Sequence, residues 1–162
     1  MKSRSAEVFF LKYAFPCANV LLQKGTISRE DYDLLEDATK KKEVLSREFL
    51  EKCFPAAFRR IKKLAETMQR NYWDIEVMKE YWHHDHNLNI DAGEGNYSKF
   101  PNSFCDFCKV HIAEVEKILP QGFLLIKYGD IERPVNSEYI SDIKVGDKVR
   151  IHHAYAIEKV EI

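Results

Sequence analysis

The sequence has no apolar run that approaches the roughly 20 residues needed to cross a lipid bilayer, so we expect no membrane-spanning segment. It also has no basic surplus, because 25 lysines and arginines stand against 26 aspartates and glutamates. General nucleic-acid-binding proteins usually carry such a surplus, and this balance therefore disfavours that class. The basic start Met1–Ser5 precedes Glu7 and Lys12, which interrupt the apolar stretch that a secretory signal requires. We therefore expect a cytoplasmic protein.

Cysteine is scarce, and the common catalytic motifs are missing. The chain has four cysteines, Cys17, Cys53, Cys105 and Cys108. In a cytoplasmic chain such cysteines are more often thiols or metal ligands than a disulfide framework. No serine–histidine–aspartate set, phosphate loop or paired-carboxylate motif is visible. The sequence therefore predicts a protein that is not an enzyme.

The hydrophobic periodicity changes near residue 90 and predicts an α+β fold. Before that point apolar residues recur at helical spacing, and after it short alternating runs are separated by turn residues. We expect a helical bundle over 1–86, a linker or loop rich in Asn, Gly, Ser and Asp over 87–104, and a β-barrel domain over 105–162. Five short strands in so small a domain favour a closed barrel, because closure removes exposed strand edges.

Four helices are predicted in the first domain, beginning near residues 6, 28, 46 and 71. Pro16 and Pro55 should kink or restart the first and third helices, because proline lacks the backbone N–H and clashes with the preceding turn. Ser28 can cap the second helix, with Asp31 three residues on. Aromatic residues at helical spacing are expected in the core. They are Trp73, Tyr81 and Trp82.

The end of the chain carries a combination of motifs that resembles a known family. Val145–Val160 contains a Gly-Asp turn, a hydrophobic strand, His152, a small-aromatic-Ala-Ile stretch, and an acidic residue followed by a basic one. The hairpin Tyr128–Asn136 precedes it, and Cys108 lies further upstream, at the distance of the family's essential cysteine. In these features the chain from Cys108 to about Glu161 resembles the HypC/HupF family of small chaperones that help to assemble nickel–iron hydrogenases.

The resemblance implies an OB-like barrel and a non-catalytic assembly chaperone. Members of the family bind a scaffold protein, help to carry an iron centre and deliver it to the hydrogenase large subunit. The implied partners are therefore a maturation scaffold protein and the precursor of a metalloenzyme large subunit. Carried over residue by residue, Cys108 would be the thiolate that takes iron or the partner, and His152 would be the second functional residue. Residues 1–100 carry no comparable resemblance.

A second hypothesis uses the same cysteine as a zinc ligand. His83 and His86 at the expected end of the fourth helix, and Cys105 and Cys108 at the start of the barrel, are each separated by two residues. Such an H-x2-H and C-x2-C set suits tetrahedral zinc. Further candidates are His84 and His111 as alternative ligands and Asp85 as a residue that orients an imidazole. A histidine run stabilised by the helix dipole, together with a metal-free thiol pair, is the simpler explanation.

Three functions therefore stay open. The first is a chaperone or binding module that holds zinc, iron or a partner through Cys108 and His152, and the second is a zinc-containing structural protein. The third, an OB-type nucleic-acid-binding module, is disfavoured by eight basic against ten acidic side chains over 105–162. A thioredoxin-type redox pair is disfavoured because that motif requires a helix and a strand is expected here. His152 and His153, adjacent on a strand, should point to opposite faces.

Overall fold

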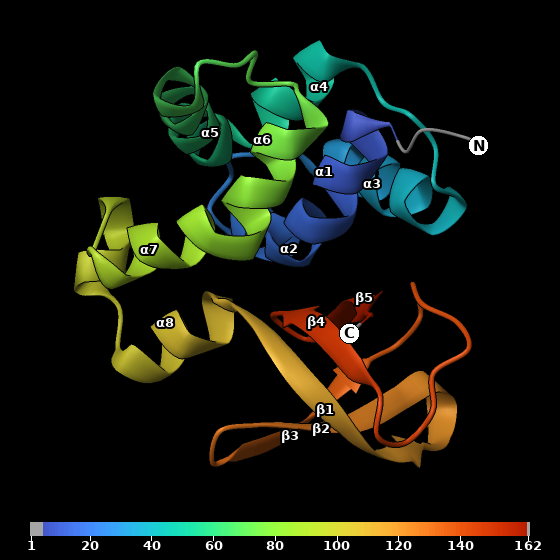
Figure 1. The fold of residues 1–162 in the computed structure, drawn as a ribbon. Helices are drawn as coiled ribbons and strands as arrows, with labels where there is room; N and C mark the ends of the chain where they lie inside the picture. The colour runs from blue at the N-terminus through green and yellow to red at the C-terminus, as the bar shows by residue number, and fades with distance from the viewer. Residues whose placement is uncertain (1–4, 162) are drawn as a thin grey trace. The chain divides into compact units, whose positions relative to one another are not determined.

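The computed structural model describes residues 5–161. The chain divides into two compact units, Met1–Asn89 and Ile90–Ile162 (Figure 1). The first is helical and the second contains a closed five-stranded barrel, which confirms the predicted α+β fold. Of the expectations made on the chain ends, those on Met1–Arg4 and on Ile162 lie outside the described residues. Within 5–161, the helices are too short or too polar to cross a bilayer.

Prolines divide the helices of the N-terminal unit where the sequence predicts breaks. Its helices are α1 (Ala6–Ala14), α2 (Ala18–Gln23), α3 (Arg29–Lys41), α4 (Arg47–Cys53), α5 (Pro55–Met68) and α6 (Ile75–Glu80), followed by a π-helical segment (Tyr81–Asp85). The next helix, α7 (His86–Asp91), crosses the boundary between the two units. A 3-10 turn containing Pro16 separates α1 from α2. Pro55 is the first residue of α5, where its missing N–H costs no helical hydrogen bond.

Serine caps fix the helix starts that the sequence indicates. The hydroxyl of Ser28 accepts from the backbone N–H of Asp31 at 3.0 Å, and the Asp31 carboxylate accepts from the N–H of Ser28 at 3.4 Å. Ser46 caps α4 in the same way, accepting from the N–H of Phe49 at 3.2 Å. The fourth predicted helix begins later than expected, at Ile75, because Asp74 provides its cap.

An aromatic cluster forms the core of the helical unit. Phe10 is fully buried, and its ring centroid lies 4.6 Å from that of Phe58 and 5.8 Å from that of Trp82. Tyr13 stacks on Trp82 with the rings inclined by 16°. The expected core residues Trp73, Tyr81 and Trp82 are at most 5% exposed, so their assignment to the core is confirmed.

The segment predicted as a linker or loop, 87–104, is largely helical. It contains most of α7, a 3-10 helix (Gly95–Lys99) and the first residues of α8 (Asn102–Cys108). Its polar composition indicates a loop, but short helices are stabilised by packing rather than by propensity, and Ile90 is buried. Gly93 and Gly95, both at positive φ, provide the break between α7 and the 3-10 helix.

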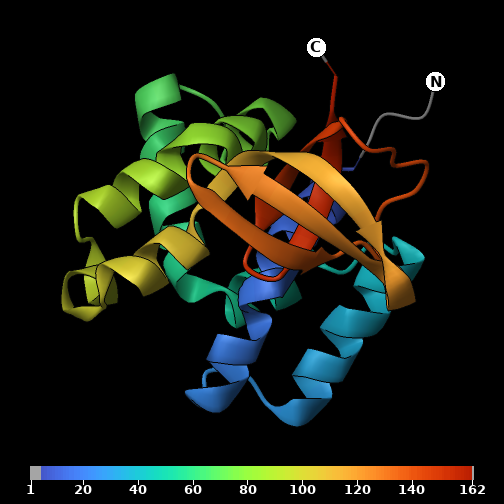
Figure 2. The ribbon, with the colours of Figure 1, turned by 90° about the horizontal axis from the view of Figure 1, so that it is seen from below.

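The five strands close into a barrel with the order β1-β2-β3-β5-β4 (Figure 2). They are β1 (Val110–Leu119), β2 (Phe123–Tyr128), β3 (Ile131–Asn136), β4 (Lys148–His152) and β5 (Tyr155–Val160). A parallel β3–β5 pair closes an otherwise antiparallel sheet. This strand order is that of an OB-fold, as expected. The inward-facing side chains form its core, namely Ala113, Val115, Leu124, Ile126, Val135, Val149, Ile151 and Ala156.

The long strand β1 closes the barrel by pairing on both sides. Its first half pairs with β4, with Val110 opposite His152, and its second half pairs with β2. A register shift between Val115 and Lys117 marks the change, since a bulge bends a strand and increases its twist. β3 meets β5 only at the pair of Asn136 and Tyr155, so most of this proline-containing strand is paired on one side only, by β2.

We expect Ser28→Ala to lower the free energy of unfolding of the helical unit by about 1 kcal/mol, because the first turn of α3 loses its cap. Urea denaturation followed by circular dichroism at the helical wavelength measures the change. Thr26→Ala removes an exposed hydroxyl two residues earlier and serves as the control. Equal stability of the two variants would contradict the role of the cap.

Candidate functional site

The pairing of β1 with β4 gathers the candidate residues of the barrel at one end. Val110, the first residue of β1, lies opposite His152, the last residue of β4. Cys108 ends α8 two residues before Val110 and is only 3% exposed. The ring of its neighbour Phe107 lies 5.0 Å from that of His153. The two residues that the family resemblance selects, Cys108 and His152, thus come from adjoining segments of this barrel end.

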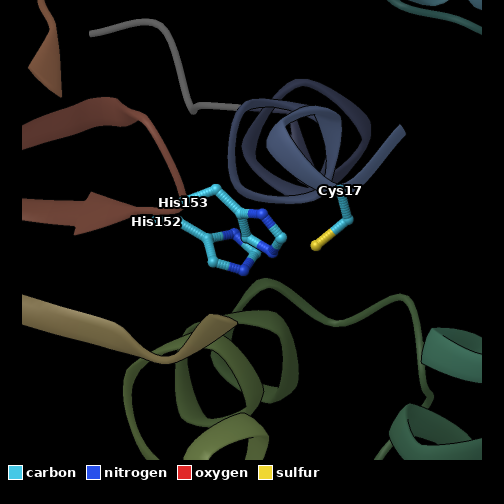
Figure 3. Close-up of side chains that lie close together, drawn as sticks. All are labelled: Cys17, His152 and His153. Atoms are coloured by element: carbon cyan, nitrogen blue, oxygen red, sulfur yellow. The ribbon is translucent and has the colours of Figure 1, made fainter. Parts of the chain in front are cut away.

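His152 and His153 place their imidazole rings next to each other (Figure 3). The ring centroids are 4.8 Å apart at an interplanar angle of 79°, and a ring nitrogen of each lies within 4.8 Å of the other. His152 is fully buried and His153 is 6% exposed. The expectation that the two side chains point to opposite faces of a strand is therefore wrong.

The hairpin between β4 and β5 explains this arrangement. His152 pairs with Tyr155, which leaves a two-residue loop of His153 and Ala154. Two-residue hairpins use turns with positive φ at the first loop position, because only these match the twist of the strands. His153 has φ 54°, so the alternation of the strand ends at His152. The turn directs both rings to the same place.

The surroundings of His153 keep its imidazole uncharged. Burial lowers the pKa of His153 to about 2, and the neighbouring His152 and the guanidinium of Arg133 act in the same direction. A neutral imidazole has a free nitrogen lone pair, which is the form that binds metal ions. The pair could therefore provide two nitrogen ligands for a metal.

Arg133 of β3 connects this pair with a stack of aromatic rings. Its Nη1 donates to the backbone carbonyl of His153 at 2.7 Å, and its Nε donates to the hydroxyl of Tyr128 at 3.3 Å. The guanidinium lies 4.7 Å from the ring centroid of Phe107 and 5.6 Å from that of Tyr128, within cation–π range. Its Nη2 is buried and has no hydrogen-bond partner within residues 5–161.

Asp106 and His111 complete the network on the other side of Tyr128. The Tyr128 hydroxyl donates to the Asp106 carboxylate at 2.9 Å, and His111 Nε2 donates to the Asp106 backbone carbonyl at 2.8 Å. The His111 ring stacks on Tyr128 with centroids 4.0 Å apart. Burial lowers the pKa of His111, although Asp106 opposes the shift. The rings and the guanidinium thus form a continuous series from His111 to His152.

The C-x2-C pair lies on a helix and not at the start of a strand, contrary to the expectation. Cys105 and Cys108 are both in α8, and Cys108 is its last residue. The negative end of the helix dipole disfavours a thiolate there, so a thioredoxin-type redox pair stays disfavoured for a different reason. The half-buried Cys105 lines a surface pocket of about 510 Å³, with Tyr97 and Lys109 also in its wall.

The four residues of the zinc hypothesis are divided between the two units. His83 and His86 belong to the N-terminal unit, and Cys105 and Cys108 belong to the C-terminal unit. Nε2 of His83 lies 3.3 Å from the hydroxyl of Tyr13, and the His86 ring packs 5.2 Å from Trp82. The sulfur of Cys105 lies 3.6 Å from the Tyr97 carbonyl. Zinc binding by this set stays a prediction.

The sequence suggests that the histidine run ends its helix, but helical structure continues beyond it. His83 and His84 lie in the π-helical segment and His86 is the first residue of α7, so the dipole of a helix end does not explain the run. His84 is exposed and contacts Glu80, its Nδ1 lying 3.2 Å from the carboxylate. Asp85 accepts a hydrogen bond from the Asn89 amide at 2.9 Å. The ring of His86, which follows the π-helical segment, packs against Trp82.

Sequence reasoning missed His153 as a partner of His152, and missed Arg133, Phe107 and Tyr128 altogether. A usable signal for His153 exists, because two short β runs flank His152–Tyr155 and imply a hairpin there. Histidine is one of the few residues besides glycine that tolerates positive φ. No sequence signal joins Arg133 to His153, because their contact depends on the closed sheet.

In comparisons with known proteins, no family model, curated protein or solved structure matches this chain. The resemblance to the HypC/HupF family therefore rests on the sequence motifs alone.

Cysteine reactivity provides a test of the burial pattern. Burial raises the pKa of the Cys53 thiol to about 11, with the Asp31 carboxylate adding to the effect. At pH 8 only about one Cys53 side chain in 1000 is then the reactive thiolate. We expect iodoacetamide to leave Cys53 unmodified in the folded protein while it labels the half-buried Cys105, as peptide mass spectrometry would show. Equal labelling of both in the folded state would contradict the burial of Cys53.

Proposed function

We propose that this protein is a non-catalytic metal-holding module of the HypC/HupF kind, in which His152 and His153 bind the ion at the end of the barrel. Zinc and iron are the candidate ions, since imidazole nitrogen suits both. Cys108 would be the thiolate through which the metal or a partner protein is taken up and released. The observation that carries the proposal is the buried pair of adjoining imidazoles.

The two adjoining imidazoles could each contribute one nitrogen to the same ion. Neutral imidazole is a common ligand of zinc and iron, and burial favours the neutral form. The ring nitrogens lie at most 4.8 Å apart here. Two nitrogens that each bond the same Zn²⁺ at about 2.0–2.1 Å also lie within that separation.

The segment on which the pair lies supports the same role. His152 is the histidine of the motif that resembles the family, and Cys108 is the cysteine that matches its essential thiol. The register of β1 and β4 pairs His152 with Val110, which lies two residues after Cys108. A thiolate that joined the two imidazoles would suit transfer of a metal, because a ligand can leave one protein while another protein provides its replacement.

We predict that the purified chain binds about one Zn²⁺ or Co²⁺ and that His153→Asn weakens this binding. Removal of a ligand should cost more than the roughly 10- to 100-fold that loss of a ligand's hydrogen-bond partner costs. Asparagine is chosen because it tolerates the positive φ of this position. Competition with a chromophoric chelator measures the affinity, and elemental analysis measures the stoichiometry.

His84→Asn is the matched control, because it removes an exposed histidine that lies outside the pair. Serine variants of the four cysteines, made one at a time, identify any thiol that completes the coordination. Wild-type affinity in His153→Asn, together with loss of metal in Cys105→Ser or His83→Asn, would replace this proposal by the zinc hypothesis. A folded wild-type protein that binds neither ion would refute both.

The proposed partners are a maturation scaffold protein and the precursor of a metalloenzyme large subunit. We expect the tagged chain to recover such proteins from its host, with Cys108→Ser reducing the yield. Cys53→Ser is the control, since that thiol is fully buried in the helical unit. Recovery of RNA in place of these proteins would instead favour the OB-type nucleic-acid-binding function.

A further inference from the structure

The backbone of His153 is held in a conformation that costs free energy. A residue with a side chain at positive φ is strained, and His153 has φ 54°. Such a conformation persists only where surrounding contacts fix it. The adjoining rings of His152 and His153 depend on it, because an extended residue at 153 would continue the alternation and separate the two side chains.

Arg133 provides a side-chain contact that holds this turn from the neighbouring strand β3. Its Nη1–H bond to the His153 carbonyl, at 2.7 Å, is a short charge-assisted hydrogen bond. Pairing between β3 and β5 occurs only at Asn136 and Tyr155, and the N–H of Asn136 donates to the carbonyl of Ala154 at 2.7 Å. Arg133 adds the second contact from β3 to the turn, at the carbonyl of His153. The guanidinium therefore links β3 to the β4–β5 turn beside the shortest strand pairing of the barrel, that of β3 with β5.

The same guanidinium acts on the side chain of His153 through Phe107. Arg133 lies against one aromatic ring, Phe107, whose edge contacts the His153 imidazole at a centroid distance of 5.0 Å. On its other side the Tyr128 hydroxyl accepts from Arg133 and is itself fixed by Asp106. Arg133 thus has little freedom to move, and it restricts both the backbone and the ring of His153.

We propose that Arg133 is the positioning residue of the His152–His153 pair: it fixes the turn at His153 and thereby brings the two ring nitrogens into a geometry suited to one metal ion. The proposal rests on the proposed metal-holding function. A lysine cannot replace Arg133, because an ammonium group has no planar fork that bonds a carbonyl and a hydroxyl while stacking on two rings.

The first test needs no metal. In nuclear magnetic resonance spectra of the full chain, the three-bond H–N–Cα–H coupling of residue 153 reports its φ, and contacts between ring protons report the closeness of His152 and His153. We expect Arg133→Met and Arg133→Lys to change the coupling and to weaken the ring-to-ring contact. Lys127→Met removes a cation from the neighbouring strand β2, where its side chain is exposed, and should leave both signals unchanged.

The second test uses Co²⁺, whose visible spectrum depends on coordination geometry. We expect both Arg133 variants to bind Co²⁺ about 10- to 100-fold more weakly than the wild type and with an altered spectrum, the usual effect of losing a residue that orients a ligand. Lys127→Met should retain the wild-type affinity and spectrum. Arg133→Lys keeps the charge and serves where Arg133→Met fails to fold.

The two tests separate the two proposals. A wild-type protein that binds no Co²⁺ refutes the metal-holding function, while the nuclear magnetic resonance signals still decide whether Arg133 fixes the turn. A wild-type protein that binds Co²⁺ and Arg133 variants that bind it with the same affinity and spectrum would refute the role of Arg133 alone.

Discussion

Closure of the five-stranded sheet is the constraint on which the barrel unit depends. A sheet this small buries its apolar face by curling on itself, and β1 achieves closure by pairing first with β4 and then with β2. The bulge between Val115 and Lys117 supplies the bend. Closure also brings Val110 opposite His152, although 42 positions separate them in the sequence. The candidate site is therefore a consequence of how the barrel closes, and a change that shifts this register would displace every residue of the site.

Local strain at one residue brings two imidazoles together at that barrel end. In a regular strand His152 and His153 would lie on opposite faces, and one ring would face solvent. The positive φ at His153 prevents this, and the hydrogen bond from Arg133 to its carbonyl offsets part of the cost. The stack that holds Arg133 uses residues from α8, β2 and β3, namely Phe107, Tyr128 and Arg133 itself. The geometry of two side chains thus depends on three elements.

Much of this fold follows from local rules that act within a few residues. Ser28 and Ser46 cap helices because a hydroxyl satisfies free N–H groups nearby, and Pro55 starts a helix because it lacks a donor. The helices of 87–104 do not follow from such local rules. Their polar residues favour a loop, and packing of residues such as Ile90 stabilises the helices instead. The site divides in the same way. Motif spacing selects His152 and Cys108, whereas the contact between Arg133 and His153 depends on strand pairing at long range.

The helix α8 gives the cysteine pair a role that its spacing alone does not indicate. C-x2-C on a tight turn would present both sulfurs to one ion, but on α8 Cys105 faces a surface pocket and Cys108 ends the helix in a buried position. The residues between them, Asp106 and Phe107, contact Tyr128 and His153. Any ligand or modification that moves α8 therefore acts on the imidazole pair through Phe107 and Arg133. The segment that carries the cysteines is therefore also a structural support of the histidine pair, through the contact between Phe107 and His153.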